Sequence, residues 1–239
     1  MSNEWFQFKQ FTIRQDLCAM KVGTDGVLLG AWAKGGQRIL DVGTGTGLIA
    51  LMMAQRYDAC FVEALEIDRD ACRQAKVNVE ASPFADRVRV REVALQQFET
   101  VKQFDSIVSN PPYFVEGLRS PDAKRSMARH SDTLPYETLC QSAYRLLTNE
   151  GEMSVVLPVE SVEQFSTTAV ISGFYLRKNY LIRTVARKSP KRCLMAWVKR
   201  RPEMLDEQTL TLFDDAGEMF EWYAKLMNNS ENERSRHIV

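Results

Sequence analysis

The feature that most constrains the fold of this chain is a run of glycines between a predicted strand and a predicted helix. Residues 39–42 are mainly apolar, residues 43–47 alternate glycine with threonine, and residues 48–57 carry apolar side chains at helical spacing. Glycines let the backbone turn tightly and approach a ligand closely, while the free N–H groups of the helix face the loop. The third glycine comes one position too early for a dinucleotide-binding GxGxxG, and no Gly-Lys-Ser/Thr follows to make a P-loop. The pattern therefore predicts a strand, a ligand-binding loop and a helix.

The rest of the chain continues this alternation of strands and helices. Strands are predicted at 37–42, 61–67, 88–91, 104–109 and 153–157, and helices at 48–57, 69–81 and 136–147. Two longer strands, 174–185 and 192–199, follow with a turn at Ser189 and Pro190. Regular alternation predicts an α/β fold, with a mainly parallel sheet, helices on both faces and an antiparallel edge strand from the terminal hairpin.

The two ends of the chain add smaller elements. Alternating apolar residues predict a short strand or hairpin near the N-terminus, and an apolar run predicts a helix at 27–32 with Asp25 or Thr24 as its cap. The apolar spacing of 219–227 indicates a helix packed on the core. The hairpin residues are Phe6, Phe8, Phe11 and Ile13.

Length and composition favour one domain over residues 1–239, with an extension at 1–36, a core at 37–201 and a closing segment at 202–239. An apolar share of 45% in 239 residues is enough for one substantial core. The five cysteines include no CxxC pair and the two histidines are far apart, so we expect reduced packing cysteines and no metal. No signal-like or membrane-length apolar stretch is present in the sequence, so we expect a cytoplasmic monomer without a membrane partner.

A second motif, Asn110, Pro111, Pro112 and Tyr113, follows the predicted strand 104–109. Two prolines donate no N–H and hold the backbone extended, so the carbonyl groups there stay free. The asparagine side chain adds an acceptor and the tyrosine adds a flat face. Together they suit a planar group with an exocyclic NH₂, whose protons the Asn110 side chain and the Pro111 carbonyl accept. The tetrad looks like that of amine-methylating enzymes, and it leaves nucleobase and glutamine amides equally open.

Residues 41–47 read Asp-x-Gly-x-Gly-x-Gly, which resembles the S-adenosylmethionine loop of class I methyltransferases. Glu66 ends the next strand, where a carboxylate can accept both ribose hydroxyls of the cofactor. Relatives commonly carry an aspartate after the third strand, where this chain has Ala94. The residues expected to bind the cofactor from these motifs are Asp41, Gly43, Thr44, Gly45, Glu66, Ile67, Val93, Ala94 and Asn110.

The formal net charge of zero conceals an uneven distribution of charge. Residues 177–201 contain ten Lys or Arg and no Asp or Glu, and residues 119–130 contain four more cations against Asp122. Nine acidic residues against three basic ones follow from Glu203 onward. A basic region of this size predicts binding of RNA phosphates, so we expect tRNA as the partner. The residues expected to contact RNA are Arg125, Arg129, His130, Arg187, Lys188, Lys191 and Arg192.

Taken together, the motifs resemble the bacterial tRNA(Val) adenine-N6 methyltransferases nearly from end to end. The resemblance also includes Lys-Val-Gly-Thr-Asp at 21–25, Ala-Arg-His at 128–130, Ser-Pro-Lys-Arg at 189–192 and the closing stretch 210–226. It implies a class I methyltransferase (Rossmann-like) fold, S-adenosylmethionine as cofactor and methylation of the adenine beside the anticodon of a valine tRNA. It also implies that Lys21, Gly23 and Thr24 lie over the methionine end of the cofactor.

Three alternatives remain at this point. Protein glutamine-N5 methyltransferases share the tetrad but carry an N-terminal helical domain, and only some 36 residues precede the first core strand here. Ribosomal RNA guanine-N2 methyltransferases are the nearest competitor. A protein that binds S-adenosylmethionine without catalysis is the third.

Overall fold

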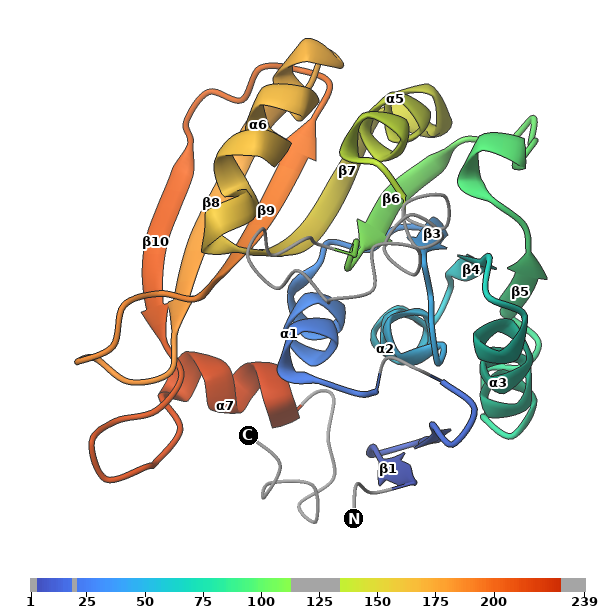
Figure 1. Cartoon of the computed structure of the whole chain (residues 1–239), viewed down its shortest axis with the longest axis horizontal. Helices are drawn as coiled ribbons and strands as arrows, with labels where there is room; N and C mark the ends of the chain where they lie inside the picture. Colours follow the sequence, from blue (N-terminus) through green and yellow to red (C-terminus); the bar gives the residue numbers. More distant parts are fainter. Residues whose placement is uncertain (1–3, 19–20, 113–133, 229–239) are drawn as a thin grey trace, which may run out of the picture.

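The computed structural model describes residues 4–18, 21–112 and 134–228 as an eight-stranded sheet with helices on both faces (Figure 1). The helices and strands, in chain order, are β1 (Trp5–Gln7), β2 (Thr12–Arg14), α1 (Thr24–Trp32), β3 (Arg38–Val42), α2 (Leu48–Arg56), β4 (Phe61–Glu66), α3 (Arg69–Glu80), β5 (Val88–Glu92), β6 (Phe104–Ser109), α5 (Tyr136–Leu146), β7 (Leu147–Pro158), α6 (Val162–Ile171), β8 (Tyr175–Arg183), β9 (Arg192–Val198), β10 (Asp206–Thr211) and α7 (Glu221–Asn228). Two single turns, η1 (Leu95–Gln97) and η2 (Val159–Ser161), complete them. The predicted α/β fold is confirmed.

The strand order of the sheet is β10-β8-β9-β7-β6-β3-β4-β5. Strands β5, β4, β3, β6 and β7 run parallel to one another, and β9 runs antiparallel to both its neighbours, β7 and β8. The order reverses between β3 and β6. In open α/β sheets a ligand binds in the crevice at such a reversal, beyond the carboxyl ends of the strands.

The prediction of an antiparallel strand at the edge of the sheet is wrong in its position. The antiparallel strand β9 lies between β7 and β8, and the edge is β10, which pairs parallel with β8. Strand β10 was not predicted, because this strand begins Asp-Glu-Gln and has no apolar run. Its first residue, Asp206, instead accepts a hydrogen bond from the hydroxyl group of Tyr180 on β8.

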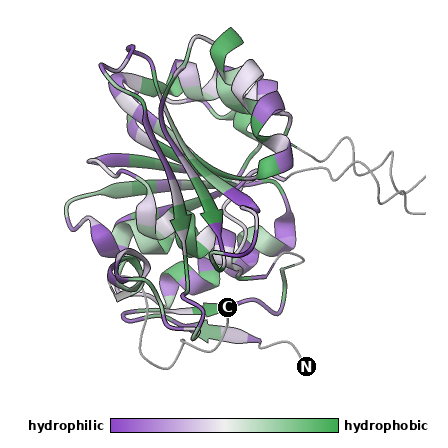
Figure 2. Cartoon of the chain, turned by 90° about the vertical axis from the view of Figure 1, so that its left-hand side faces the viewer, coloured by the Kyte–Doolittle hydropathy of each residue, from purple (hydrophilic) through white to green (hydrophobic). Residues whose placement is uncertain are grey.

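Two apolar layers hold the helices to the sheet. On one face α1, α2 and α7 pack on residues such as Ile39 and Val108, and on the other face α5 and α6 pack on residues such as Leu40 and Ile107. Neighbouring residues on one strand thus point to opposite layers, as the two-residue period of a strand requires. The side view shows apolar residues along the central strands and more hydrophilic ones in the outer loops (Figure 2).

The N-terminal segment is bound to the core through polar side chains as well as through its buried aromatic residues. The predicted hairpin is confirmed as β1 and β2. The amide group of Asn78 on α3 accepts from the backbone N–H of Arg14 (2.9 Å) and donates to the carbonyl groups of Arg14 (2.8 Å) and Thr46 (2.9 Å). One buried amide therefore joins the N-terminal segment, α3 and the glycine loop, residues 43–47.

The prediction that Asp25 or Thr24 caps the first helix is wrong. Helix α1 begins at Thr24, its cap is Gly23, and no side chain makes a cap hydrogen bond there. Asp25 lies in the first turn and accepts from the guanidinium group of Arg192, with Nε–O distances of 2.7 and 2.8 Å. The carboxylate therefore joins α1 to the start of β9.

All five cysteines are free and buried, as expected for packing residues. Among the described residues, no helix is both long enough and apolar enough to cross a membrane. The same part of the chain contains no group of three or more His, Cys, Asp or Glu side chains that could hold a metal ion.

Candidate functional site

A cavity of about 330 Å³ lies at the carboxyl ends of β3, β4, β5 and β6, where the strand order reverses. We call it the carboxyl-edge cavity. The predicted site residues that line it come from four separate loops and are Gly43, Gly45, Glu66, Ile67, Val93, Ala94, Asn110 and Pro112. Its volume falls within the range of small-molecule sites.

The glycine loop exposes its backbone to this cavity. Gly43 and Gly45 have φ values of +72° and +56°, a region that disfavours side chains, and a Cβ atom added at either would meet nothing within 4 Å. The backbone N–H groups of Gly43 and Thr44 donate to the carbonyl of Leu65 at 3.0 and 2.9 Å. The loop is therefore tied to the end of β4 and remains open on its ligand side.

Glu66 connects the glycine loop to the loop after β4. One carboxylate oxygen accepts from the backbone N–H of Gly45 (2.8 Å), and the other accepts from those of Ile67 (2.8 Å) and Asp68 (2.9 Å). A carboxylate oxygen can accept more than one hydrogen bond, so Glu66 keeps acceptor capacity toward hydroxyl groups in the cavity. The side chain is nearly buried and its orientation is fixed.

Asp41 and Thr44, both expected to bind the cofactor, do not line the cavity. One oxygen of the fully buried Asp41 carboxylate accepts from the Thr44 hydroxyl group (2.6 Å) and from the Ala50 N–H (3.1 Å). Its other oxygen, Oδ1, has no hydrogen-bond partner among the described residues. Burial raises the pKa of Asp41 to about 7, although both hydrogen bonds favour the charged form. Asp41 therefore holds the glycine loop against the first turns of α2.

Asn110 follows the end of β6 and lines the cavity next to Gly43, since Val42 pairs with Ser109. The Ser109 hydroxyl group donates to the carbonyl of Val42 (2.9 Å), which joins the ends of β6 and β3. Pro111 is buried and Pro112 lines the cavity. The Asn110 side chain makes no hydrogen bond with another described residue. Tyr113 lies outside the described residues.

Several residues that line the cavity were not predicted from the sequence, and they are Cys18, Val42, Leu65, Asp68, Ala71, Leu95, Gln96 and Leu134. Cys18 reaches the cavity because the N–H of Leu17 donates to Gln74 of α3 (3.1 Å). Burial, together with the charges of Glu66, Asp68 and Asp16, raises the pKa of the Cys18 thiol to about 11. The thiol is therefore neutral at physiological pH.

The segment expected over the methionine end of the cofactor lies outside the cavity lining, since Lys21, Gly23 and Thr24 do not line it. Gln96 is the polar residue near Ala94 that lines the cavity. Glu92 does not line it. The lining thus offers an open glycine backbone, an oriented carboxylate and the half-exposed apolar side chain of Ile67. These groups fit the amino acid, ribose and adenine parts of S-adenosylmethionine.

The predicted RNA-binding residues lie in two parts of the chain. Arg125, Arg129 and His130 fall outside the described residues. The other four belong to 184–192, between β8 and β9, and we call residues 184–191 the basic turn. Arg192 is paired with Asp25, whereas Arg187, Lys188 and Lys191 are exposed and their side chains contact no partner among the described residues.

Most other cations of the 177–201 stretch are engaged within the fold. Arg177 pairs with the buried Glu152 at 3.3 Å, and the Lys199 ammonium group donates to the Leu147 carbonyl at 2.6 Å. Further contacts within the fold join Lys178 to the Trp32 ring, Arg183 to Thr211 and Arg200 to Glu150. The unpaired charge is therefore concentrated in the basic turn.

The basic turn lies at the same edge of the sheet as Asn110. Arg192, the first residue of β9, is opposite Pro158 at the end of β7, and Val155 of β7 is opposite Ser109 of β6. Two strand spacings of about 4.8 Å, together with the three residues from Val155 to Pro158 at about 3.3 Å each, put the start of β9 roughly 14 Å from the end of β6. The exposed cations thus lie on the same edge of the sheet as the carboxyl-edge cavity.

Known proteins resemble this chain in sequence and in fold. The family model of the methyltransferase small domain matches residues 22–170. A tRNA1(Val) (adenine(37)-N6)-methyltransferase of Bacteroides thetaiotaomicron is 48% identical, covering 88% of this chain and 90% of the relative. The protein of that name from Phocaeicola vulgatus is 50% identical, covering 82% and 85%. In fold, the chain is similar to a predicted O-methyltransferase of Agrobacterium tumefaciens, with a TM-score of 0.69, 20% identity and coverage of 86% and 96%.

Replacement of the buried carboxyl group by Asp41→Asn should change how stability depends on pH. A carboxyl group whose pKa is raised from 3.8 to about 7 by folding stabilises the fold fully below pH 4, and this contribution is lost as pH rises through 7. Relative to wild type, the variant should gain on the order of 4 kcal/mol of unfolding free energy between pH 4 and pH 7. Urea unfolding at four pH values measures this. The exposed Asp58→Asn is the control, and a pH-independent difference for Asp41→Asn would contradict the raised pKa.

Proposed function

This chain belongs to the methyltransferase small domain family, and from that premise we propose that it methylates the exocyclic amino group of an adenine in tRNA. The substrate we propose is the adenine beside the anticodon of tRNA(Val), the base that the names of its relatives specify. We further propose that residues 1–239 act as one methyltransferase domain, in the cytoplasm and as a monomer.

The observation that carries the proposal is the position of Asn110. Its amide lines the carboxyl-edge cavity, beside the start of the glycine loop because Val42 pairs with Ser109, and makes no hydrogen bond with another described residue. Because the amide is half-buried at an open cavity, water can satisfy it, and a ligand that displaces this water must supply a hydrogen-bond partner in its place. An amine with two protons to donate, held next to the cofactor, supplies it.

The glycine loop, Glu66 and the apolar residues beside Ala94 are the groups that would hold S-adenosylmethionine. When bound, the cofactor supplies a methyl group activated by a positively charged sulfur. The Gly43 and Gly45 backbone admits close approach, and Glu66 accepts from hydroxyl groups. Ala94 offers no acceptor to an adenine amino group, and Gln96 brings an amide to the same wall.

The chain's own part in the reaction is to orient the amine and to reduce the conjugation of its lone pair with the ring. The adenine amino nitrogen is a poor nucleophile, because its lone pair is delocalised into the ring. Acceptance of its two protons by the Asn110 side chain and the Pro111 carbonyl favours the pyramidal form and directs the lone pair at the methyl group. The neutral Cys18 thiol does not compete as a nucleophile. Tyr113, next in the chain, is proposed to stack on the base.

We propose that the basic turn holds the RNA backbone beside the cavity. Arg187, Lys188 and Lys191 are exposed at the edge of the sheet that carries Asn110. Arg125, Arg129 and His130 are proposed for the same role from their sequence alone. A base in an anticodon loop can be splayed out at little cost, whereas a base in a duplex must be flipped.

The substrate class can be tested directly with S-adenosylmethionine labelled in its methyl group. We expect label in tRNA, and digestion to nucleosides should place it on N6 of adenosine. Ribosomes and release factor are the parallel substrates. Label in ribosomal RNA guanine or in a release-factor glutamine would replace the proposal by one of those alternatives, and label in none would favour a cofactor-binding protein without catalysis.

The Asn110→Ala variant should lose far more of its methyl transfer than of its affinity for the cofactor, which the glycine loop and Glu66 also hold. Removal of one preorganised acceptor for a transition state costs roughly 100- to 1000-fold in kcat. Single-turnover transfer to tRNA gives the rate, and calorimetry gives the affinity for S-adenosylmethionine. The exposed Asn149→Ala is the matched control. Equal rates for the two variants would remove Asn110 from the mechanism.

Charge reversal in the basic turn should weaken RNA binding without affecting the cofactor. The triple variant Arg187→Glu, Lys188→Glu, Lys191→Glu should bind tRNA at least about tenfold more weakly, because each lost phosphate contact also removes released counterions. Its plot of log affinity against log salt should be less steep. Fluorescence anisotropy with labelled tRNA measures both quantities, and a slope identical to that of the wild type would exclude the turn from the RNA interface.

A further inference from the structure

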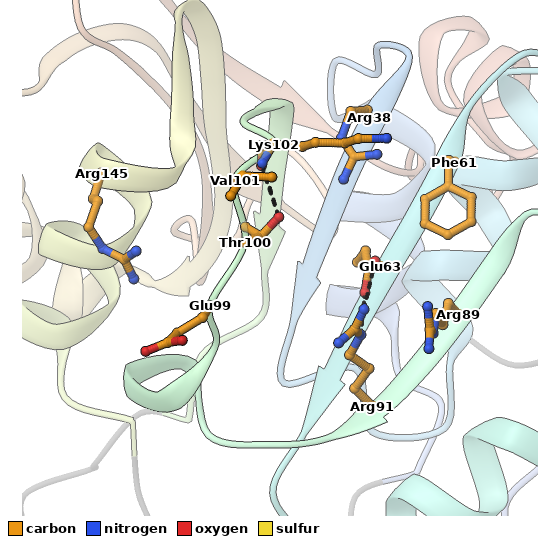
Figure 3. Close-up of a pocket in the computed structure, with 10 residues that line it drawn as sticks. All are labelled: Arg38, Phe61, Glu63, Arg89, Arg91, Glu99, Thr100, Val101, Lys102 and Arg145. Atoms are coloured by element: carbon orange, nitrogen blue, oxygen red, sulfur yellow. Dashed lines mark hydrogen bonds and ion pairs between the residues drawn. The ribbon is translucent and has the colours of Figure 1, made fainter.

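A second and larger hollow, of about 930 Å³, lies near the amino ends of β3 and β4, away from the carboxyl-edge cavity. We call it the basic groove, and Figure 3 shows its lining. The residues come from β3, β4, β5, the loop before β6 and α5, and they are Arg38, Phe61, Glu63, Arg89, Arg91, Glu99, Thr100, Val101, Lys102 and Arg145. No role has been assigned to them so far.

The groove exists because none of the described helices covers the sheet on this side. The connection between β5 and β6 contains the single turn η1 where a longer helix could cover β4 and β5. The side chains on this face are accordingly polar: Val88 of β5 is buried in the opposite apolar layer, whereas Arg89 and Arg91 line the groove. A charged, concave sheet face indicates a binding surface rather than missing core.

The groove holds more positive charge than the fold neutralises. Arg91 is paired with Glu63 at 2.7 Å. The guanidinium group of Arg38 lies 5.2 Å from the centre of the Phe104 ring and 5.9 Å from that of Phe61, and its Nε has no hydrogen-bond partner among the described residues.

Three further cations are exposed on different walls of the groove. Arg89 comes from β5, Lys102 from the loop before β6 and Arg145 from the last turn of α5 (Figure 3). Within the described part of the chain, their charged groups make no hydrogen bond or ion pair. Glu99 is the remaining acidic residue of the lining. The unpaired surplus is therefore positive and suits an anionic ligand.

We propose that the basic groove binds the sugar-phosphate backbone of the RNA substrate, at a point remote from the methylated base. This inference rests on the proposed function, since it takes tRNA as the ligand. Arginine matches the geometry of phosphate groups with a planar, bidentate fork, and it predominates among the cations here. The half-buried ring of Phe61 adds a face on which a base or sugar can pack.

The separation of the two sites agrees with one extended RNA. Arg38 begins β3 and Gly43 follows its end, so the groove and the cavity are separated by about 13 to 17 Å along the strand, at about 3.3 Å per residue. This equals the axial rise of roughly four or five nucleotides in one strand of a duplex. A single RNA arm can therefore contact the groove while one of its bases enters the cavity.

The test is a triple charge reversal, Arg89→Glu, Lys102→Glu and Arg145→Glu, in the full chain. We expect tRNA affinity to fall about tenfold or more, with a lower salt dependence. The KM for tRNA should rise while kcat and the affinity for S-adenosylmethionine stay near wild type. The matched control reverses three exposed cations outside the groove, Lys9, Arg73 and Lys76, and should retain most of the affinity. A neutral variant with glutamine at the three groove positions should lose less tRNA affinity than the charge-reversal variant. The glutamine variant is used for the test if the charge-reversal variant fails to fold.

Each outcome decides between the possibilities. Wild-type tRNA affinity in the groove variant would overturn the inference, and it would leave an acidic protein segment as the alternative occupant. An equal loss in the control variant would also overturn it, by showing that net charge alone determines binding. If the wild-type protein neither bound nor methylated tRNA, the proposed function itself would fail. This result differs from a failure of the groove inference, because it is seen with the wild-type protein, before any substitution is made.

Discussion

The candidate site depends on two carboxylates that hold one glycine loop. Asp41 accepts from Thr44 and Ala50, and Glu66 accepts from the N–H of Gly45 at 2.8 Å. Without these acceptors the N–H groups would be left unsatisfied next to an apolar core, which costs about 1 to 3 kcal/mol each. The loop can therefore keep positive φ angles and an open backbone. Gly43 and Gly45 of this fixed loop form part of the wall of the carboxyl-edge cavity.

The order of strands and helices could be predicted because each buried strand is an apolar run of its own. The sequence is less informative where burial is partial. Strand β10 is mostly polar and pairs at the edge through backbone groups, so periodicity gave no signal for it. Helix α6 was not predicted either, because only two of its residues, Phe165 and Ala169, are buried. These elements are fixed by pairing and packing partners that come from distant parts of the sequence.

The site residues that could be predicted from the sequence are those that stand at the ends of strands. Glu66 and Asn110 each follow a buried strand, and parallel strands bring their carboxyl ends to one edge. Cys18 and Gln96 could not be predicted in this way. Cys18 reaches the cavity through the contacts of the N-terminal segment with α3, and such contacts between isolated polar residues leave no periodic pattern.

Charge along the sequence is a poor guide to charge on the surface. The 177–201 stretch has ten cations, but six of them contact carboxylates, carbonyl or hydroxyl oxygens, or an aromatic ring within the fold. A cation already paired in this way gains little from a phosphate, because the ligand must first replace the existing partner. The cations of the basic groove come instead from four separate stretches of the sequence, and they meet only after β3, β5, the loop before β6 and α5 are assembled. Affinity for a polyanion depends on the cations that folding leaves unpaired, and these are recognised only in three dimensions.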